Sequence, residues 1–260
     1  MATPKVLILR APGTNCETET AYAFELAGAK TTLLHVNRLI ESPTLAKDHQ
    51  ILCFPGGFSY GDDIAAGRIL AQQLKVHLSD VVNQFRDQDH LVLGICNGLQ
   101  IMMRLGIFFE SSEAAPVTLT LNRQARFEDR WVHVAATPNN SVFLRGIDRM
   151  YLPIAHAEGR LVLQSSEVGR QLASSGQLCL RYTAEDGAVG GETLPFPTNP
   201  NGADMNVAGL SDSTGRIFGL MPHPERHIAA THHPFWTRRT EQPEHGEGLA
   251  LFRNAVDYFS

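Results

Sequence analysis

The sequence predicts an α/β fold: a doubly wound, mostly parallel sheet flanked by helices, with added antiparallel strands. Two observations lead to this fold class. Up to residue 106, short apolar runs of strand length alternate with segments whose apolar residues recur at helical spacing, as in sheets with helices on both faces. Beyond residue 106, short β-like runs follow one another with turn residues between them, as in antiparallel strands.

The first half contains four predicted strands and the helices that connect them. The first helix begins behind Thr14 or Asn15, either of which is a suitable cap, and it ends at Gly28. The region around Pro43 is predicted as a loop. A long helix is predicted after the strand 51–54 and the stretch Pro55–Asp63, and it runs to about Phe85. The strands are predicted at 6–9, 31–36, 51–54 and 91–95, and a helix from about residue 99 ends at Gly106.

The second half reads as an extension of the same domain, so a single domain is expected over residues 1–260. His232–Gly248 is polar and contains prolines and glycines, which predicts a surface loop whose position suggests contact with a partner. Residues 249–259 predict a terminal helix. The β-like runs are 117–121, 131–136, 150–155, 161–163, 177–182, 207–210 and 216–221.

Composition excludes several classes of protein. Hydrophobic residues make up 43% and the net charge is −5, which is ordinary for a globular protein and gives no basic face for nucleic acid. No segment has the pattern of a signal peptide or the length of a membrane span. The chain is therefore expected to be cytoplasmic, without nucleic-acid or membrane partners. Cys16, Cys53 and Cys179 are interpreted as structural, and no spacing predicts a metal site.

The stretch from residue 90 to 106 organises the chain. Gly94 and Gly98 bracket Cys96 where the central strand gives way to a helix, a Gly-x-nucleophile-x-Gly pattern. Glycines there leave space for a strained, exposed turn, and a helix N-terminus favours a thiolate. A buried core cysteine is an equally good interpretation of this stretch on its own.

A cysteine nucleophile needs a base and a group that orients the base. His223 and Glu225 lie two residues apart at the end of a predicted strand, so an extended backbone would point them to the same side. This predicts a Cys96–His223–Glu225 triad. A second pair of the same spacing, His156 and Glu158, is a competing candidate.

Acyl chemistry also needs hydrogen-bond donors for a developing oxyanion. The backbone N–H groups of Gly57 or Phe58 and of Asn97 are the candidates, although each also fits an ordinary tight turn. Asp62 is interpreted as a helix cap, as is its neighbour Asp63, rather than as an acid. Arg226 is equally compatible with an ion pair near the site and with a solvated position.

Several of these stretches together resemble a known family, the class I (triad) glutamine amidotransferases. Within that class the sequence is similar to the glutaminase subunits of phosphoribosylformylglycinamidine synthase, an enzyme of purine biosynthesis. The resemblance runs from Val6 to the last helix. Its motifs are Pro55-Gly-Gly-Phe-Ser-Tyr-Gly-Asp62, Gly94-Ile-Cys-Asn-Gly-Leu-Gln100, Asn122 to Arg130, Ala155-His-Ala-Glu-Gly-Arg160, Asn199-Pro-Asn-Gly202 and Met221-Pro-His-Pro-Glu-Arg226.

The resemblance implies hydrolysis of L-glutamine to glutamate and ammonia. Cys96 would attack the side-chain amide, His223 would protonate the departing ammonia, and Gln100 would help to hold the substrate. The ammonia would pass to a partner synthetase that uses ATP and magnesium to make formylglycinamidine ribonucleotide from formylglycinamide ribonucleotide, commonly with a small bridging subunit. The chain itself would bind no cofactor and no metal, since it lacks a phosphate-binding loop of the Walker type.

Three other functions remain open at this point. One is a peptidase- or chaperone-like relative with an elbow cysteine, although Gln100 and the Pro-Gly-Gly loop at Pro55 would then be unexplained. The chain could serve a different ammonia acceptor, since a triad does not name the acceptor; the Phe58 to Asp62 and Arg126 to Glu128 matches argue against that. It could also be a non-catalytic binding or redox module that uses Cys96 as a reactive thiol. The presence of both His223 and Glu225 argues against the module, because a sensor thiol needs no oriented base.

Overall fold

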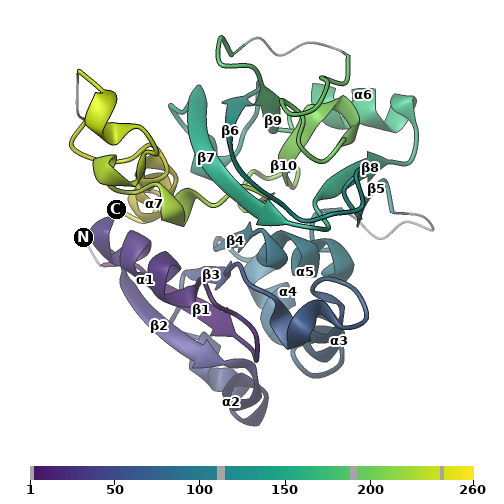
Figure 1. Cartoon of the computed structure of the whole chain (residues 1–260). Coiled ribbons are helices and arrows are strands. Elements are labelled where there is room, and N and C mark those ends of the chain that lie inside the picture. The colour runs from purple at the N-terminus through teal and green to yellow at the C-terminus, as the bar shows by residue number, and fades with distance from the viewer. Residues whose placement is uncertain (1–2, 110–114, 188–191, 241–242) are drawn as a thin grey trace.

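The computed structural model describes residues 3–109, 115–187, 192–240 and 243–260. Its main element is a nine-stranded sheet in the order β2-β1-β3-β4-β11-β10-β9-β6-β7 (Figure 1). Strands β2, β1, β3, β4 and β11 run in parallel. Strands β10, β9, β6 and β7 continue the sheet in antiparallel pairs. The predicted fold class is confirmed.

The parallel half follows the predicted strands closely. They are β1 (Lys5–Arg10), β2 (Lys30–His35), β3 (Ile51–Phe54) and β4 (Leu91–Ile95), and β3 and β4 are buried along their whole length. Strands buried on both faces are expected to be continuous apolar runs. Where a loop was expected around Pro43, the chain forms a short helix α2 (Val36–Glu41) and a 3₁₀ turn η1 (Pro43–Ala46).

The helices of this half differ from prediction in two details. Helix α1 (Glu17–Leu26) begins behind Cys16 without a side-chain cap, so the predicted cap at Thr14 or Asn15 is wrong. The Thr14 hydroxyl accepts from the Ala11 N–H, and the Asn15 carbonyl oxygen accepts from the Cys16 thiol. The predicted long helix is two, α3 (Arg68–His77) and α4 (Ser79–Asp87), because Leu78 leaves helical geometry. This break lets α4 pack its own apolar face against β4.

The second half builds the antiparallel strands and one helix that the sequence analysis missed. Helix α6 (Ser166–Ser174) is capped by the Ser165 side chain, which accepts from the Val168 N–H. Strands β5 (Val117–Thr120) and β8 (Arg160–Leu163) form a separate pair. The remaining strands are β6 (Glu128–Ala136), β7 (Arg149–His156), β9 (Leu180–Thr183), β10 (Val207–Ser211) and β11 (Ile217–Leu220).

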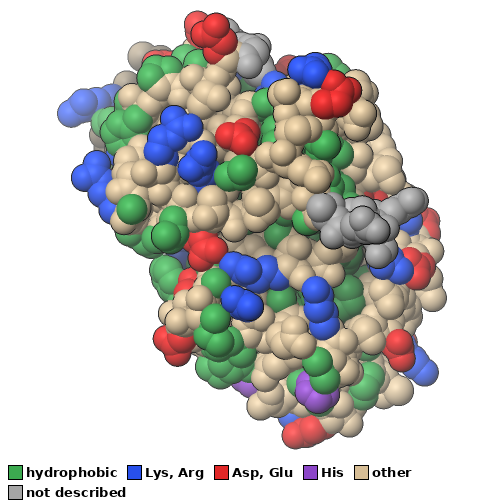
Figure 2. All heavy atoms as spheres, turned by 90° about the vertical axis from the view of Figure 1, so that its right-hand side faces the viewer, with side chains coloured by type: hydrophobic (Ala, Val, Ile, Leu, Met, Phe, Trp, Pro, Cys, Tyr) green, Lys and Arg blue, Asp and Glu red, His purple; other side chains and the backbone are tan. Residues whose placement is uncertain are grey.

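The chain ends beside its beginning. The terminal helix α7 (Leu249–Asp257) packs on α1, where the Phe24 and Phe252 rings meet edge to face with centroids 4.9 Å apart (Figure 1). The described part of the His232–Gly248 loop contains short 3₁₀ turns, among them η7 (Trp236–Arg238). Among the described residues, no helix combines the length and apolar character needed to cross a bilayer. Acidic and basic side chains are interspersed on the face in Figure 2.

Candidate active site

Cys96 lies on a strained turn between β4 and helix α5 (Asn97–Leu105), with φ 51° and ψ −104°. A non-glycine residue in that region costs roughly 1–3 kcal/mol. The two bracketing glycines are required by close packing. A Cβ at Gly98 would lie 1.9 Å from the Phe54 carbonyl oxygen, and one at Gly94 would lie 2.3 Å from Met102 Sδ. The predicted strained elbow is therefore present in the structure, but it is buried and not exposed as expected, since Cys96 is 4% exposed.

The predicted oxyanion donors lie on the two neighbouring strand-end loops, and they are not equivalent. The Phe58 N–H donates to the Gly13 carbonyl oxygen at 2.9 Å, so it is already in use. Within the described chain, no hydrogen bond is formed by the N–H of Gly57 or of Asn97. The N–H groups of Gly57 and Asn97 thus keep their donor capacity in the described chain, whereas the Phe58 N–H would have to give up its bond to Gly13 before it could donate elsewhere.

The Asn97 side chain fastens the loop after β3 to the elbow. Its carbonyl oxygen accepts from the Ser59 N–H at 3.1 Å, and its amide donates to Asp62 Oδ1 at 3.1 Å. Asp62 also accepts from the Gly67 N–H. Helix α3 has no side-chain cap, so the predicted capping role of Asp62 is wrong, and this carboxylate links the loop to the elbow instead. Burial raises the pKa of Asp62 above its ordinary value.

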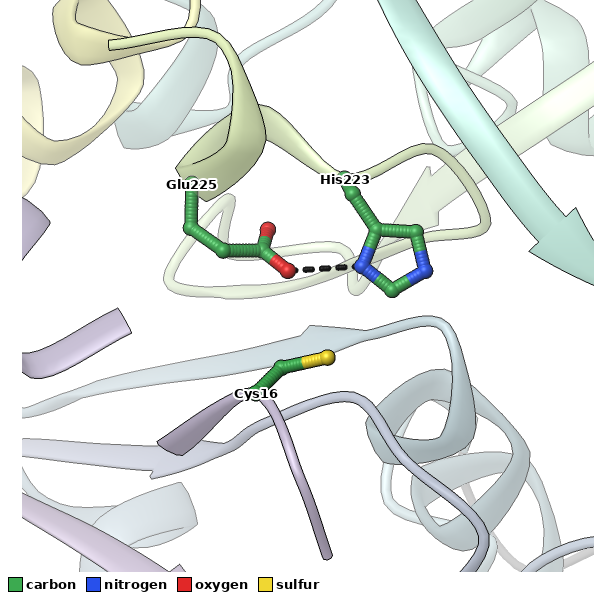
Figure 3. Close-up of side chains that lie close together, drawn as sticks. All are labelled: Cys16, His223 and Glu225. Carbon is green, nitrogen blue, oxygen red and sulfur yellow. Dashed lines mark hydrogen bonds and ion pairs between the residues drawn. The ribbon is translucent and has the colours of Figure 1, made fainter. Parts of the chain in front are cut away.

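His223 and Glu225 come together as predicted, although for a different reason. The imidazole Nδ1 lies 2.6 Å from Glu225 Oε1 (Figure 3). The two residues are not on a strand, because the chain turns into a 3₁₀ turn, η5 (Pro224–Arg226), directly after His223. A tight turn, rather than alternation along a strand, brings the side chains to the same side. The turn is fixed on β7, where the Pro153 carbonyl oxygen accepts from the His223 N–H at 2.8 Å.

The surroundings of His223 favour the protonated ring. Burial by itself favours the neutral form, but the Glu225 carboxylate and the thiols of Cys96 and Cys16 outweigh it. The pKa of His223 is consequently raised well above its ordinary value. Among the described residues, Nε2 of this ring has no hydrogen-bond partner. The imidazole is thus oriented through one nitrogen and able to exchange a proton through the other.

Two further side chains border the ring. Cys16 is buried, and its sulfur accepts a hydrogen bond from Arg226 Nη2 at 3.2 Å. Arg226 Nε also lies 3.3 Å from Glu19 Oε1, so the ion-pair alternative for this arginine is confirmed. Nothing in the sequence pattern connects Cys16 to His223, and the structure alone places them together. Cys53 and Cys179 are buried in the core, in line with a structural role.

The competing pair, His156 and Glu158, does not form a pair in the structure. His156 Nδ1 lies 3.1 Å from Asn122 Oδ1, and burial, aided by the charge on His223, lowers the pKa of His156 to about 3. Glu158 instead accepts from the Ala66 N–H. Among the described residues, no carboxylate pairs with the His156 ring, and its lowered pKa keeps it neutral, so His156 is a weaker candidate than His223 for the base of the triad.

Glu158 and Gln100 belong to a network that sequence reasoning missed. Glu158 Oε1 lies 3.0 Å from Arg104 Nη2, and Arg104 Nε donates to the Ala66 carbonyl oxygen. The Gln100 amide donates to the Glu158 carbonyl oxygen at 2.5 Å and accepts from Asn97. Gln100 therefore reaches the site, but in this state both ends of its amide are in use. The four-residue spacing of Gln100 and Arg104 on a predicted helix was the available signal.

The site is closed in this state. Cys96 is 4% exposed and His223 is 2% exposed. A separate hollow of about 570 Å³ is lined by residues of β6, of β7 and of the loops beside them, among them Tyr151, His233 and Glu247. His227, just after the 3₁₀ turn, binds the Tyr151 carbonyl oxygen through Nδ1 at 2.7 Å. In the described part of the loop after residue 232, the His233 ring lies 5.8 Å from the His227 ring, so this part packs against the segment that follows the turn.

Comparison with protein families identifies the whole chain. Residues 3–259 match the model of the CobB/CobQ-like glutamine amidotransferase domain. The chain is 46% identical over 260 residues to the phosphoribosylformylglycinamidine synthase subunit PurQ of Dehalococcoides mccartyi, covering 99% of this chain and 98% of that protein. It is 42% identical over 275 residues to the PurQ subunit of Methanococcus maripaludis, again covering 99% and 98%.

Solved structures share the fold. The structure of PurLQS from Thermotoga maritima contains a chain that superposes with a TM-score of 0.72 at 24% identity, covering 100% of both chains. A glutamine amidotransferase from Methylobacillus flagellatus superposes with a TM-score of 0.54 at 14% identity, covering 99% of this chain and 96% of that one. At these identities the structural matches establish the architecture and no more.

Proposed function

The chain belongs to the family of CobB/CobQ-like glutamine amidotransferase domains, and we propose that it is the glutaminase subunit of phosphoribosylformylglycinamidine synthase. In this role it hydrolyses L-glutamine and supplies the ammonia to a synthetase that converts formylglycinamide ribonucleotide to the amidine. The names of relatives at 46% and 42% identity, matched over almost their full length, support this acceptor.

The first half-reaction forms a thioester. The Cys96 sulfur attacks the side-chain amide carbon of glutamine, and the amide oxygen becomes an oxyanion. In this proposal the N–H groups of Gly57 and Asn97, which form no hydrogen bond within the described chain, donate to the oxyanion, and such donors commonly contribute about 3–4 kcal/mol to a barrier. His223 then gives its proton to the departing nitrogen. The carbon–nitrogen bond breaks, and ammonia leaves a glutamyl thioester on Cys96.

The second half-reaction returns the enzyme to its starting state. His223, neutral after the first step, takes a proton from water as the water oxygen attacks the thioester carbon. The carbon–sulfur bond breaks, glutamate leaves, and the proton is available again on the ring. Glu225 remains a carboxylate throughout, because its task is to hold Nδ1 and stabilise the imidazolium.

One observation carries the proposal: a buried His–Glu pair with 2.6 Å between Nδ1 and Oε1 lies against a cysteine on a strained elbow. A redox module needs the elbow thiol and has no use for the oriented base. A structural cysteine needs neither the strain nor the open donors. The strained elbow, the oriented His–Glu pair and the unpaired N–H groups together favour acyl transfer from an amide.

Delivery of ammonia implies partners. We propose that the synthetase binds ATP and magnesium, that this chain binds no cofactor of its own, and that a small bridging subunit completes the complex. PurLQS of Thermotoga maritima is an assembly that contains a chain of this fold. The closed site, with Cys96 and His223 almost without exposed surface, supports a glutaminase that opens only when its partner is engaged.

Covalent labelling tests the nucleophile and the substrate together. The chain is incubated with a glutamine analogue that carries a diazo-ketone, and adducts are located by mass spectrometry. We expect a single adduct on Cys96 that excess glutamine prevents, no adduct in Cys96→Ala, and full labelling of Cys179→Ser as the matched control. Labelling of Cys16 or Cys53 in preference to Cys96 would overturn the assignment, as would no labelling in the presence of the synthetase and its nucleotides.

The acceptor is tested separately in a reconstituted reaction. With glutamine, ATP, magnesium and the synthetase, the chain should support formation of formylglycinamidine ribonucleotide, and Cys96→Ala should support it only when free ammonia is added. Failure of the wild-type chain with glutamine, beside success with ammonia, would mean that the chain serves another acceptor.

A further inference from the structure

Cys16 lies beside the proposed base without belonging to the triad. It directly precedes α1, and Figure 3 shows its side chain pointing toward the His223–Glu225 pair. The Cys16 sulfur, a ring nitrogen of His223 and a carboxylate oxygen of Glu225 all lie within 4.8 Å of one another. Cys16 is 1% exposed, so the sulfur and the ring meet inside the protein.

Two loops bring the sulfur to the ring. The Cys16 N–H donates to the Gly56 carbonyl oxygen at 3.2 Å, which ties the segment before α1 to the loop after β3. A Cβ at Gly56 would lie 3.1 Å from the Cys16 sulfur and 2.8 Å from His223 Cε1. The sulfur and this edge of the ring therefore face the same narrow space, and a glycine at position 56 keeps that space free.

The hydrogen bonds of the thiol decide what it presents to the ring. Burial raises the pKa of Cys16, so the side chain is a neutral thiol with one proton to donate. That proton is donated to Asn15 Oδ1 at 3.2 Å, and Arg226 Nη2 donates to the sulfur at 3.2 Å. Because its proton is directed to Asn15, the sulfur acts toward His223 as an acceptor.

The other groups around the ring act in both directions. Burial favours the neutral ring, whereas the Glu225 carboxylate favours the imidazolium, and the neighbouring thiols add to its effect. His156 is itself neutral, because burial lowers its pKa to about 3. The charge of Arg226 is balanced by the Glu19 carboxylate, 3.3 Å from its Nε. The charged ring thus depends on several acceptors, and Cys16 supplies one of them. The ionisable groups around the ring are Glu225 and Arg226 on η5, Cys96 on the elbow, His156 on β7 and Cys16 before α1.

We propose that Cys16 is a positioning residue for the base: a sulfur lone pair faces the charged ring of His223, and the hydrogen bond from Arg226 holds that sulfur in place. The Cys16 sulfur takes no part in making or breaking bonds, and Cys96 remains the nucleophile. Because Cys16 directly precedes α1, the contact fixes the ring relative to the parallel half of the sheet, which carries the elbow. Only the kinetic consequence rests on the proposed function, since the effect on the ring needs no turnover.

The titration of His223 is the direct test. The whole chain is labelled with ¹³C at the histidine Cε1 atoms, and NMR follows the resonances as the pH is raised, with His223→Asn used to assign the signal. Cys16→Val has a similar volume but no lone pair, so it should lower the pKa of His223 by about half a unit or more. Cys16→Ser retains a lone pair and should fall between Cys16→Val and the wild type. Cys179→Val makes the same change at another buried cysteine and should leave the pKa of His223 unchanged.

Steady-state glutaminase kinetics in the presence of the synthetase measures the consequence for turnover. kcat/KM decreases at alkaline pH as the imidazolium is lost. In Cys16→Val this decrease should move to lower pH by about half a unit, which makes kcat/KM on that limb about threefold lower than the plateau alone would predict. On the plateau, kcat should fall about tenfold with KM within about twofold, because the base is less well held while substrate binding is retained.

A folded Cys16→Val variant whose His223 pKa and alkaline limb both match the wild type would overturn the proposal. An equal shift in Cys179→Val would overturn it as well, because the effect would then belong to any change in the core. A thermal unfolding midpoint within a few degrees of the wild type identifies a variant as folded. If Cys16→Val does not fold, Cys16→Ala is judged by the same two measurements. The NMR titration needs no glutaminase activity, so its result stands if the proposed function fails.

Discussion

Replacement of His156 by asparagine is a sharp test of how burial acts on this site. The ring is 2% exposed, and its Nε2 has no partner among the described residues. Asn122 Oδ1 accepts a hydrogen bond from Nδ1 of the ring, and the Asn122 side-chain amide donates to the His156 backbone carbonyl oxygen. An asparagine amide at position 156 can keep the donor at the Nδ1 position and cannot titrate.

The sign and the size of the effect follow from the pKa. Burial lowers the pKa of His156 from 6.5 to about 3, so between those two values the unfolded chain binds a proton that the folded chain does not. At pH 4.5, two units below 6.5, this one ring reduces the free energy of unfolding by about 2 × 1.36, or roughly 2.7 kcal/mol. Above pH 6.5 this ring does not reduce the free energy of unfolding, and below pH 6.5 the reduction grows as the pH falls. His156→Asn should lose stability at pH 7.5 through the smaller side chain, but should be less sensitive to acid.

Urea unfolding at pH 7.5 and pH 4.5 measures the effect. The quantity of interest is the stability lost between the two pH values in the wild type, minus that lost in the variant. We expect this difference to be about 3 kcal/mol for His156→Asn. For the control His77→Gln, which replaces an exposed histidine, we expect a difference close to zero. Equal acid sensitivity of wild type and His156→Asn would refute the argument that this ring is held neutral by burial.

The remaining predictions concern catalysis, packing and partner dependence. Glu225→Gln should lower kcat by about 10²–10⁴-fold with a smaller change in KM, because a neutral amide would favour the wrong tautomer of His223. The control is Glu244→Gln, which changes an exposed glutamate paired with a histidine. It should leave steady-state glutaminase kinetics unchanged. Gly98→Ala should destabilise the fold by about 2–4 kcal/mol in urea, because its Cβ would meet the Phe54 carbonyl oxygen, and a loss under 0.5 kcal/mol would contradict the packing. Ammonia release by the chain alone should rise about tenfold or more when the synthetase and its nucleotides are added, since a closed site must open; a full rate without them would exclude this dependence.

The elbow could be predicted because its sequence pattern is local. Gly94, Cys96 and Gly98 lie within one strand-to-helix turn, and the sequence shows the pattern there even though the contact that requires Gly98 comes from Phe54 on the neighbouring strand. The strands 51–54 and 91–95 were equally clear, since burial on both faces demands continuous apolar runs.

The pairing of His223 with Glu225 was predicted correctly from an incorrect local structure. The spacing of two suggested a strand, whereas Pro224 begins a 3₁₀ turn that achieves the same convergence. The break at Leu78 was missed for a related reason. The apolar spacing continues across it, so a periodicity argument sees one helix where packing on the sheet requires two.

The contacts of Cys16 lay beyond the reach of sequence reasoning. Cys16 and Arg226 are 210 positions apart, and their hydrogen bond exists only because α1 and the turn η5 meet across the carboxyl ends of the strands. A thiol with no motif around it reads as a core residue. Its neighbours, and therefore its chemistry, are set by topology.

The turn that carries His223 is attached to β7, which lies at one edge of the sheet. β7 is an edge strand with β6 as its one ladder partner in the sheet, and its outer side is bonded by the turn through Pro153 and Tyr151. Edge elements open at lower free energy than a sheet's centre. A sub-global opening that releases β7 would carry His223 away while β4 and Cys96 stay in place. Inactivation by heat would then begin as a local event, well before the parallel half loses its structure.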